Sequence, residues 1–249
     1  GLPFTLFTVS IAAALLPEIS TTSGSESEGD RLVPPLNSAL RHAAFLLIPC
    51  SVAFITLGDV IAGAVYQNGA FTGDDARYVW AILGALGIGL VGSSMGGMYA
   101  TAFYALGDTV TPLRASLVRL ALRVAMGVTL AIPVTRAFGL DPRWGAAGLG
   151  AAIGVSGWLE FALLRLWLSR RLGSRPERAT GAIFGLWGVA LSAGGVAWII
   201  KLWLPELGPI ATAIPVLGSY TLVYLVATSL LGFPESKTLW SQLRTVVRG

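Results

Sequence analysis

The chain has 249 residues, of which 54% are apolar and only 12% are charged. A soluble domain carries about a quarter charged residues, so this composition, with a mean hydropathy of +0.72, excludes an ordinary water-soluble protein. The net charge of +4 is compatible with nucleic-acid binding. However, the basic residues lie in short loops between apolar stretches, which is typical of membrane topology signals. The single cysteine, Cys50, excludes an internal disulfide and a cysteine-based zinc cluster.

Seven apolar segments run along the chain, each close to the roughly 20 residues that a helix needs to cross a bilayer. Each segment is apolar around its whole circumference, as expected of a helix embedded in lipid. The sequence therefore predicts an all-α, polytopic integral membrane protein with about seven transmembrane helices. The segments are residues 3–19, 42–66, 79–104, 117–138, 146–168, 180–203 and 209–232.

The stretch between the first two segments, residues 20–38, is polar, rich in Ser and Gly, and contains Pro34 and Pro35. This composition predicts a flexible, water-exposed linker. The first segment follows Gly1 almost directly and has no basic region before it, which argues against a secretory signal peptide. We expect instead a helix whose upstream part is missing, and hence a chain that is part of a larger protein.

Lys and Arg residues are distributed unevenly between the two sides of the predicted helix array. With the helix ends included, 13 of the 17 fall on the side of the 105–116 loop, the 169–179 loop and the C-terminal tail. Because basic loops remain in the cytoplasm, we predict that this arginine-rich side and the C-terminus are cytoplasmic. The four on the other side are Arg77, Arg136, Arg143 and Lys201.

Charged residues inside the apolar segments are the candidate functional residues, because each costs about 3 kcal/mol or more at the bilayer centre. Three positions lie well inside their segments: Asp59, Arg123 and Glu160. Arg119 and Arg123 are one helical turn apart and share a face. The segments that carry Arg123 and Glu160 should be antiparallel neighbours, and counting from their ends places these two at similar depth, so we predict that they pair.

Two interpretations of these charges remain open at the level of sequence. In one, Arg123 and Glu160 form an ion pair that only stabilises the fold. In the other, Arg119 and Arg123, with Glu160 beside them, line a cavity that accepts an anionic, phosphate-bearing headgroup. Arginine suits this role because its planar fork donates two hydrogen bonds to phosphate oxygens.

Other patterns indicate packing. Gly87, Gly89 and Gly92 match the spacing of a dinucleotide-binding fingerprint, but no strand precedes them and they lie in mid-segment, so we do not expect a nucleotide site. The lone histidine, His42, lies at a segment end beside Arg41 and is interpreted as an interfacial residue. No metal or cofactor site is predicted. Small residues four apart predict close helix approach: Gly92/Gly96, Gly150/Gly154 and Gly181/Gly185.

Three ordered stretches carry a family resemblance. Residues 15–20 (LLPEIS) close the first segment, residues 66–76 (YQNGAFTGDDA) follow the second, and residues 102–112 (AFYALGDTVTP) close the third. In this order and spacing they resemble the MurJ/MviN family of lipid II flippases, within the MOP exporter superfamily. The resemblance marks candidate gate or hinge residues: Pro17, Asn68, Gly69, Phe71, Asp108 and Pro112. Asp108 is also well placed to cap the helix that begins near Pro112.

The resemblance implies the C-terminal half of a fourteen-helix transporter. Residues 1–168 would form the C-terminal lobe of the core, and residues 169–249 two additional transmembrane helices and a cytoplasmic tail. The implied function is export of the undecaprenyl-diphosphate-linked peptidoglycan precursor, lipid II, by alternating access across the bacterial cytoplasmic (inner) membrane. The implied partners are this lipid-linked precursor, membrane lipids and the missing N-terminal half. Neither an enzyme activity, a cofactor nor a nucleic acid is expected.

Three alternatives remain. Another exporter of the same superfamily, such as a polysaccharide-lipid flippase or a drug/cation antiporter, would lack the motif of residues 102–112. A membrane-embedded transferase acting on lipid-linked substrates would need clustered Asp, His or Lys at a membrane face, and no loop of the sequence has such a cluster. A non-transporting membrane scaffold is the third.

Overall fold

In the computed structural model, the described residues are 28–66, 73–137, 139, 141, 143–173, 178–204 and 208–235. They are helical almost throughout and contain no strand, which confirms the predicted all-α class. The helices are α2 (Glu28–Thr56), α3 (Gly58–Tyr66), α4 (Gly73–Ala105), α5 (Val110–Thr129), the π-helical η1 (Leu130–Val134), α6 (Thr135–Ala137), α7 (Trp144–Leu172), α8 (Arg178–Trp203) and α9 (Pro209–Leu230).

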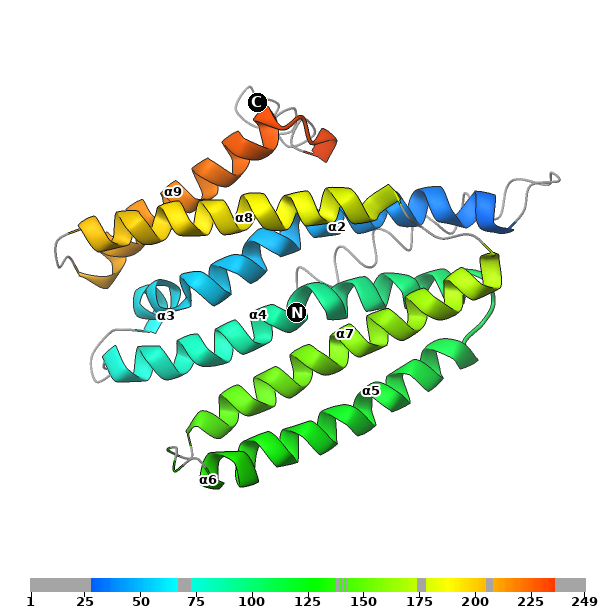
Figure 1. The fold of residues 1–249 in the computed structure, drawn as a ribbon, viewed down its shortest axis with the longest axis horizontal. Coiled ribbons are helices and arrows are strands. Elements are labelled where there is room, and N and C mark those ends of the chain that lie inside the picture. The colour runs from blue at the N-terminus through cyan, green and yellow to red at the C-terminus, as the bar shows by residue number, and fades with distance from the viewer. Residues whose placement is uncertain are drawn as a thin grey trace.

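Six candidate membrane spans occur within this described part of the chain, and successive spans run in opposite directions (Figure 1). The α4–α5 turn and the C-terminal end of α7 therefore share one end of the molecule, and the α5–α7 connection lies at the other. The spans are Leu32–Thr56, Asp75–Ala105, Val110–Ala137, Trp144–Leu172, Ile183–Trp203 and Pro209–Leu230. The predicted segment at residues 3–19 lies outside the described residues.

The predicted single segment 42–66 is wrong, because the helix breaks at Leu57 between α2 and α3. The indole Nε1 of Trp80, on α4, donates to the carbonyl of Ile55 at 2.9 Å, beside the break. A methyl group at Gly58 would overlap the Trp80 ring. A contact from another helix thus stabilises the break, which explains why the uniformly apolar sequence gives no sign of it.

The predicted linker at residues 20–38 is also wrong where the structure describes it, since α2 begins at Glu28. Pro34 and Pro35 lie inside this helix, although each removes a backbone donor. Leu32 and Leu36 are 2% and 0% exposed. These leucines recur at the four-residue spacing of a helix face, and their burial outweighs the local preference of the two prolines.

The closest helix pair is α4 with α7, whose small residues form a seam between the two backbones. A methyl group on Gly89 would overlap the Cα atom of Gly154, and one on Gly92 would lie 3.1 Å from the Cα atom of Trp158. Trp158 Nε1 donates to the carbonyl of Ile88 at 2.6 Å. The glycines of the nucleotide-like spacing therefore serve helix packing, as the sequence indicates.

On the other side of α4, α2 packs between α4 and α8, and α9 lies against α8 and α3. The Tyr224 hydroxyl, on α9, donates to the carbonyl of Phe45 at 2.8 Å. Pro49 lacks the N–H that would otherwise bond this carbonyl four residues earlier. The Tyr220 hydroxyl donates to the carbonyl of Pro49, also at 2.8 Å. Two tyrosines thus attach α9 to the proline-weakened part of α2.

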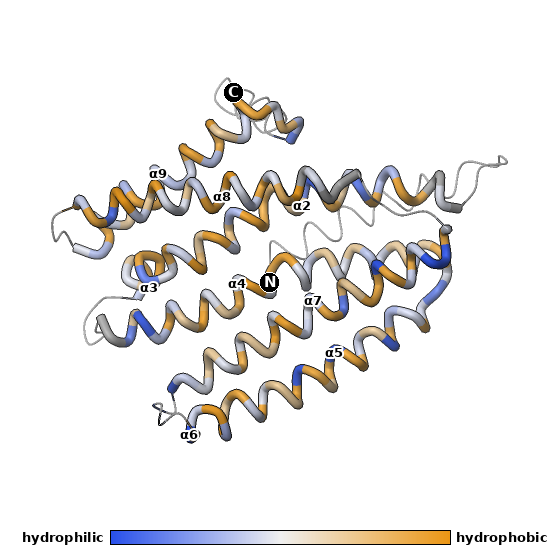
Figure 2. The backbone as a smooth tube through the Cα atoms, viewed as in Figure 1, coloured by the Kyte–Doolittle hydropathy of each residue, from blue (hydrophilic) through white to orange (hydrophobic). Residues whose placement is uncertain are grey.

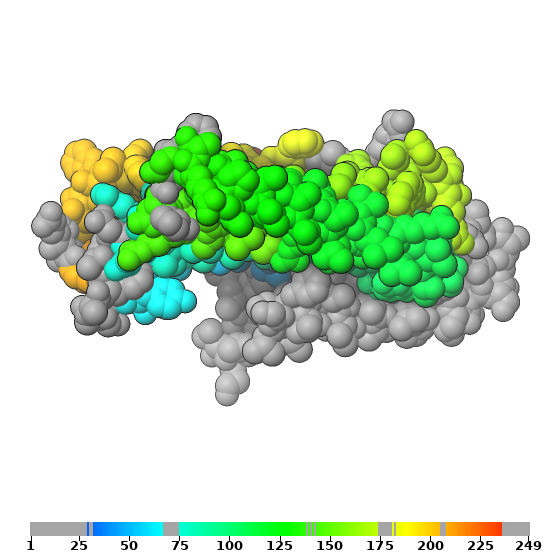
Figure 3. All heavy atoms as spheres, turned by 90° about the horizontal axis from the view of Figure 1, so that it is seen from below, coloured from blue at the N-terminus to red at the C-terminus, as the bar shows by residue number. Residues whose placement is uncertain are grey.

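Helix α5 lies at the edge of the array and packs chiefly against α7 (Figures 1 and 3). Within the apolar 18-residue stretch of each span, only 6% of the α5 stretch is buried, compared with 39% for the stretches of α4 and of α7. In Figure 2 the spans are mostly apolar, yet hydrophilic positions recur along α5. The most exposed span thus carries charge within the membrane, and the candidate site begins there.

Candidate functional site

Glu160, in the middle of α7, is buried and 5% exposed. Its Oε2 accepts a hydrogen bond from Arg119 Nη1 at 2.6 Å, and its Oε1 accepts one from Ser116 Oγ at 3.1 Å. Both donors belong to α5. A methyl group on Gly96, on α4, would lie 3.5 Å from Oε2. The carboxylate of α7 therefore contacts α5 and lies close to α4. This pairing compensates the desolvation of a carboxylate that would be costly alone.

The predicted pair of Arg123 with Glu160 is wrong, because Arg119 takes that place. The physical reason is the register between α5 and α7. Asp108 and Arg171 form an ion pair where α5 begins and α7 ends, with Asp108 Oδ2 3.3 Å from Arg171 Nη1. Arg119 lies eleven positions after Asp108, and Glu160 lies eleven positions before Arg171, so two antiparallel helices joined at the first pair also meet at the second.

Arg123 is exposed on α5 and makes no ion pair with the described residues. It lies 13 residues beyond Val110, where the span Val110–Ala137 begins, which corresponds to roughly 20 Å along a helix. This is well inside a hydrocarbon core about 30 Å thick. A guanidinium facing lipid there would cost about 3 kcal/mol or more. The side of α5 that carries Arg123 therefore requires water or polar groups beside it.

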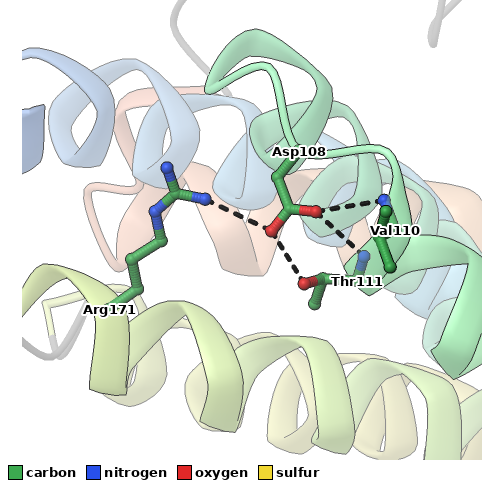
Figure 4. Close-up of polar contacts among 4 residues, drawn as sticks. All are labelled: Asp108, Val110, Thr111 and Arg171. Carbon is green, nitrogen blue, oxygen red and sulfur yellow. Dashed lines mark hydrogen bonds and ion pairs between the residues drawn. The ribbon is translucent and has the colours of Figure 1, made fainter.

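The turn between α4 and α5 is built around Asp108 (Figure 4). Its Oδ1 accepts the backbone N–H of Val110 at 3.1 Å and of Thr111 at 2.9 Å. Its Oδ2 accepts the Thr111 hydroxyl at 2.7 Å and Arg171 Nη1 at 3.3 Å. Gly107, at φ +72°, supplies the left-handed residue that ends α4. As predicted, the Asp108 side chain caps the helix that begins at Val110, although Thr109 occupies the N-cap position itself.

This hydrogen bonding has an electrostatic consequence. The backbone N–H of Thr111, its hydroxyl, and more weakly the N–H of Val110 and the charge of Arg171 all favour the ionised carboxylate. Together they lower the pKa of Asp108 below its ordinary value of 3.8. Asp108 is therefore a stably charged group at neutral pH.

The remaining motif residues are divided between the described and undescribed parts of the chain. Pro112 is buried in the first turn of α5, where its missing N–H leaves no helical hydrogen bond unmade. Pro17, Asn68, Gly69 and Phe71 lie outside the described residues.

The motif of residues 102–112 lies beside a cavity of about 260 Å³ at the end of the α4–α5–α7 group. Sequence reasoning missed the cavity residues that come from outside the motif. Their only sequence signal is a cluster of Arg and Trp at the end of a span, which is common at membrane interfaces. The lining residues are Phe103, Asp108, Thr111, Arg114, Trp167 and Arg171.

Asp59, the remaining charge predicted within a membrane segment, lies in the first turn of α3 and forms an ion pair with Lys201 of α8. The Lys201 ammonium also lies 4.5 Å from the centre of the Trp198 ring. The charge of Asp59 is therefore balanced, at the end of the molecule opposite to Asp108. Among the described residues, no group of three or more His, Cys, Asp or Glu side chains could hold a metal ion.

Comparison with known families identifies the chain. The profile of the family "Lipid II flippase MurJ" matches residues 1–218. The chain belongs to this family. A probable lipid II flippase MurJ from Rhizobium tropici is 28% identical over 230 residues. The alignment covers 91% of this chain and 41% of that protein. A lipid II flippase MurJ from Burkholderia cenocepacia is 28% identical over 169 residues, covering 68% of this chain and 31% of that protein.

The fold is also known from a solved structure of this family. The structure is described as "Lipid II flippase MurJ, inward closed conformation" and matches with a TM-score of 0.66 at 21% identity. The match covers 92% of this chain and 45% of that one. The chain thus spans less than half the length of these MurJ proteins and shares the fold of the part it matches.

Proposed function

We propose that this chain forms the C-terminal half of a lipid II flippase in the bacterial cytoplasmic membrane. Membership of the MurJ family supports this function over another exporter of the superfamily, a membrane transferase or a scaffold. In this proposal the chain works with an N-terminal half, and export proceeds by alternating access. Residues 1–168 belong to the transporter lobe, and residues 169–249 add two helices and a cytoplasmic tail.

The observation that carries the proposal is Arg123 on the exposed side of α5, which makes no ion pair with the described residues. Its depth in the span requires a polar environment, and a water-filled cavity between two lobes supplies one. A diphosphate headgroup cannot cross hydrocarbon unaided, and a guanidinium within such a cavity binds phosphate oxygens. Arg119 is neutralised by Glu160, so Arg123 is the residue we assign to headgroup binding.

The orientation of the helices follows from the same proposal. The end of the molecule that carries Asp108 and Arg171 is also the arginine-rich end, which the distribution of basic residues assigns to the cytoplasm. The C-terminus then lies in the cytoplasm as well. Lipid II is taken up at this end and released at the end that carries Asp59 and Lys201.

The test is charge reversal in the complete protein that contains this chain. Cells that depend on this protein for lipid II export should stop growing when it carries Arg123→Glu, and reconstituted protein should lose more than about nine-tenths of its lipid II flipping. Glu160→Gln should reduce flipping less, because the neutral amide still fits between Ser116 and Arg119. The matched control is Arg136→Glu, an exposed arginine near the far end of the same span, which should leave flipping within about twofold of the wild type.

Folding is assessed separately from transport. Arg123 makes no ion pair with the described residues, so membrane abundance and melting temperature should be unchanged in Arg123→Glu and in the milder Arg123→Gln. Normal flipping by a well-folded Arg123→Glu protein would refute the assignment of the headgroup site. Equal loss of abundance in the Arg123 and Glu160 variants would instead indicate a structural role for both.

A further inference from the structure

The cavity of about 260 Å³ beside the α4–α5 turn is separate from Arg123 and is not used by the proposed transport site. It lies where three spans end, at Ala105 of α4, Val110 of α5 and Leu172 of α7. This level corresponds to the boundary between hydrocarbon and the headgroup region of the bilayer. A ligand in this cavity would therefore be in reach of the membrane surface.

The walls of the cavity combine cationic and amphipathic groups. Arg114 enters it from α5 and Arg171 from α7, with Trp167 one turn before Arg171 and the buried Phe103 from α4. Among the described residues that line the cavity, the one carboxylate is that of Asp108, which already accepts three hydrogen bonds within its own turn. Because Arg171 pairs with Asp108, no carboxylate among the described lining residues balances the charge of Arg114.

Arg114 therefore supplies an excess of positive charge. It is exposed and makes no ion pair with the described residues, whereas Arg171 is shared with Asp108. A guanidinium fork with free donors favours a phosphate group. The indole ring beside it, that of Trp167, belongs to a side-chain type that is enriched at the depth of lipid headgroups.

We propose that this cavity binds the headgroup phosphate of an anionic bilayer phospholipid, with Arg114 as the principal phosphate ligand and Trp167 against the upper part of the acyl chains. Such a lipid would fill the space between the α4–α5 turn and the end of α7. The site is independent of lipid II transport, so either proposal can fail without the other.

To test this, the protein is reconstituted in phosphatidylcholine bilayers that contain a lipid brominated on its acyl chains close to the headgroup. Bromine quenches nearby indoles, and the contribution of Trp167 is the difference between the protein and its Trp167→Phe variant. Brominated phosphatidylglycerol is compared with brominated diacylglycerol, which has the same tails and no phosphate. We expect phosphatidylglycerol to quench Trp167 at a clearly lower fraction of the bilayer than diacylglycerol does.

Variants then assign the phosphate ligand. Arg114→Gln should raise the fraction of phosphatidylglycerol needed for half-quenching about fivefold, the contribution of one arginine near an anionic lipid surface. Arg114→Lys keeps the charge but loses the planar fork, so its half-quenching fraction should lie between those of the wild type and Arg114→Gln. The matched control is Arg170→Gln. Arg170 lies in the last turn of α7, near the cavity but not among its lining residues, and its replacement also removes one positive charge. This variant should leave the half-quenching fraction unchanged.

Three outcomes would overturn the proposal. Equal quenching by diacylglycerol and phosphatidylglycerol would show that the phosphate does not contribute. An equal effect of Arg114→Gln and Arg170→Gln would show general attraction to the charged surface instead of a site. Relief of the quenching by inorganic phosphate would assign the cavity to a soluble phosphate compound. Quenching that persists in inorganic phosphate supports a lipid.

Discussion

Helix α7 (Trp144–Leu172) has two neighbours on different sides, and the two interfaces are built differently. Toward α4, glycines such as Gly89 and Gly154 bring the backbones into direct contact. Toward α5, the polar contacts among the described residues include two ion pairs eleven positions apart, Asp108–Arg171 and Arg119–Glu160, and Ser116 also donates to Glu160. Small residues allow close van der Waals contact in lipid. Glycines of α7 also approach η1 closely, at Gly145 and Gly148, but along α5 itself the spaced ion pairs fix the register. We infer that α4 and α7 form a rigid unit and that α5 is attached to it at defined points.

The largest effect is expected in the glycine seam. In Gly89→Ala, the new methyl group would overlap the Cα atom of Gly154, and two backbones cannot move apart without disrupting the whole interface. Overpacking of this kind costs about 1–3 kcal/mol, or more where the backbone cannot relax. Thermal unfolding in detergent, followed by circular dichroism, should show a large drop in melting temperature.

The matched control for the seam is Gly195→Ala on α8. Its added methyl group would have no neighbour within 4 Å, and alanine is the better helix former by up to about 1 kcal/mol. The two glycine substitutions should therefore shift the melting temperature in opposite directions or, at the least, by clearly different amounts. Equal destabilisation by both would contradict the seam as the basis of rigidity.

The second effect concerns the two arginines of α5. Arg119→Ala leaves the buried Glu160 carboxylate without its cation. For a fully buried pair, this lowers the free energy of unfolding by about 3 kcal/mol. The loss should be smaller here because the Arg119 side chain is 36% exposed. Arg123→Ala removes no ion pair with the described residues and should change stability by less than about 0.5 kcal/mol. Denaturation of both variants under the same conditions measures the difference. Equal losses would mean that Arg123 has a partner that stabilises the fold.

The smallest effect is expected at Asp108 and depends on pH. Its pKa is lowered in the folded protein by the hydrogen bonds of Thr111, so the carboxylate stabilises the fold above its unfolded pKa near 3.8. This contribution decreases as the pH falls through the lower, folded pKa. The melting temperatures of the wild type and of Asp108→Asn should therefore differ at pH 6 to 7, in the range of about pH 5–8 where stability is usually greatest. They should converge as the solution is acidified below about pH 4. A difference independent of pH would exclude this origin.

Local patterns predicted the membrane spans and the helix cap well. Five of the apolar segments, those after residue 79, lie within or largely overlap described helices, because hydropathy over about 20 residues reflects where a chain is stable in lipid. The cap at Asp108 could be predicted because its partners are at most three residues away. The prolines at 34 and 35 misled the prediction, since their local preference was outweighed by the burial of Leu32 and Leu36.

The sequence by itself determined where the spans from residue 79 onward lie, which residues carry charge into them and near which residue α5 begins, since each depends on groups close together along the chain. Only the tertiary structure decided that Glu160 meets Arg119 instead of Arg123, and that the helix breaks at Leu57. The first depends on a register set by Asp108 and Arg171, 63 residues apart. The second depends on a hydrogen bond from Trp80 to Ile55, 25 residues away. Contacts over such distances follow from how helices pack, which no local pattern of residues contains.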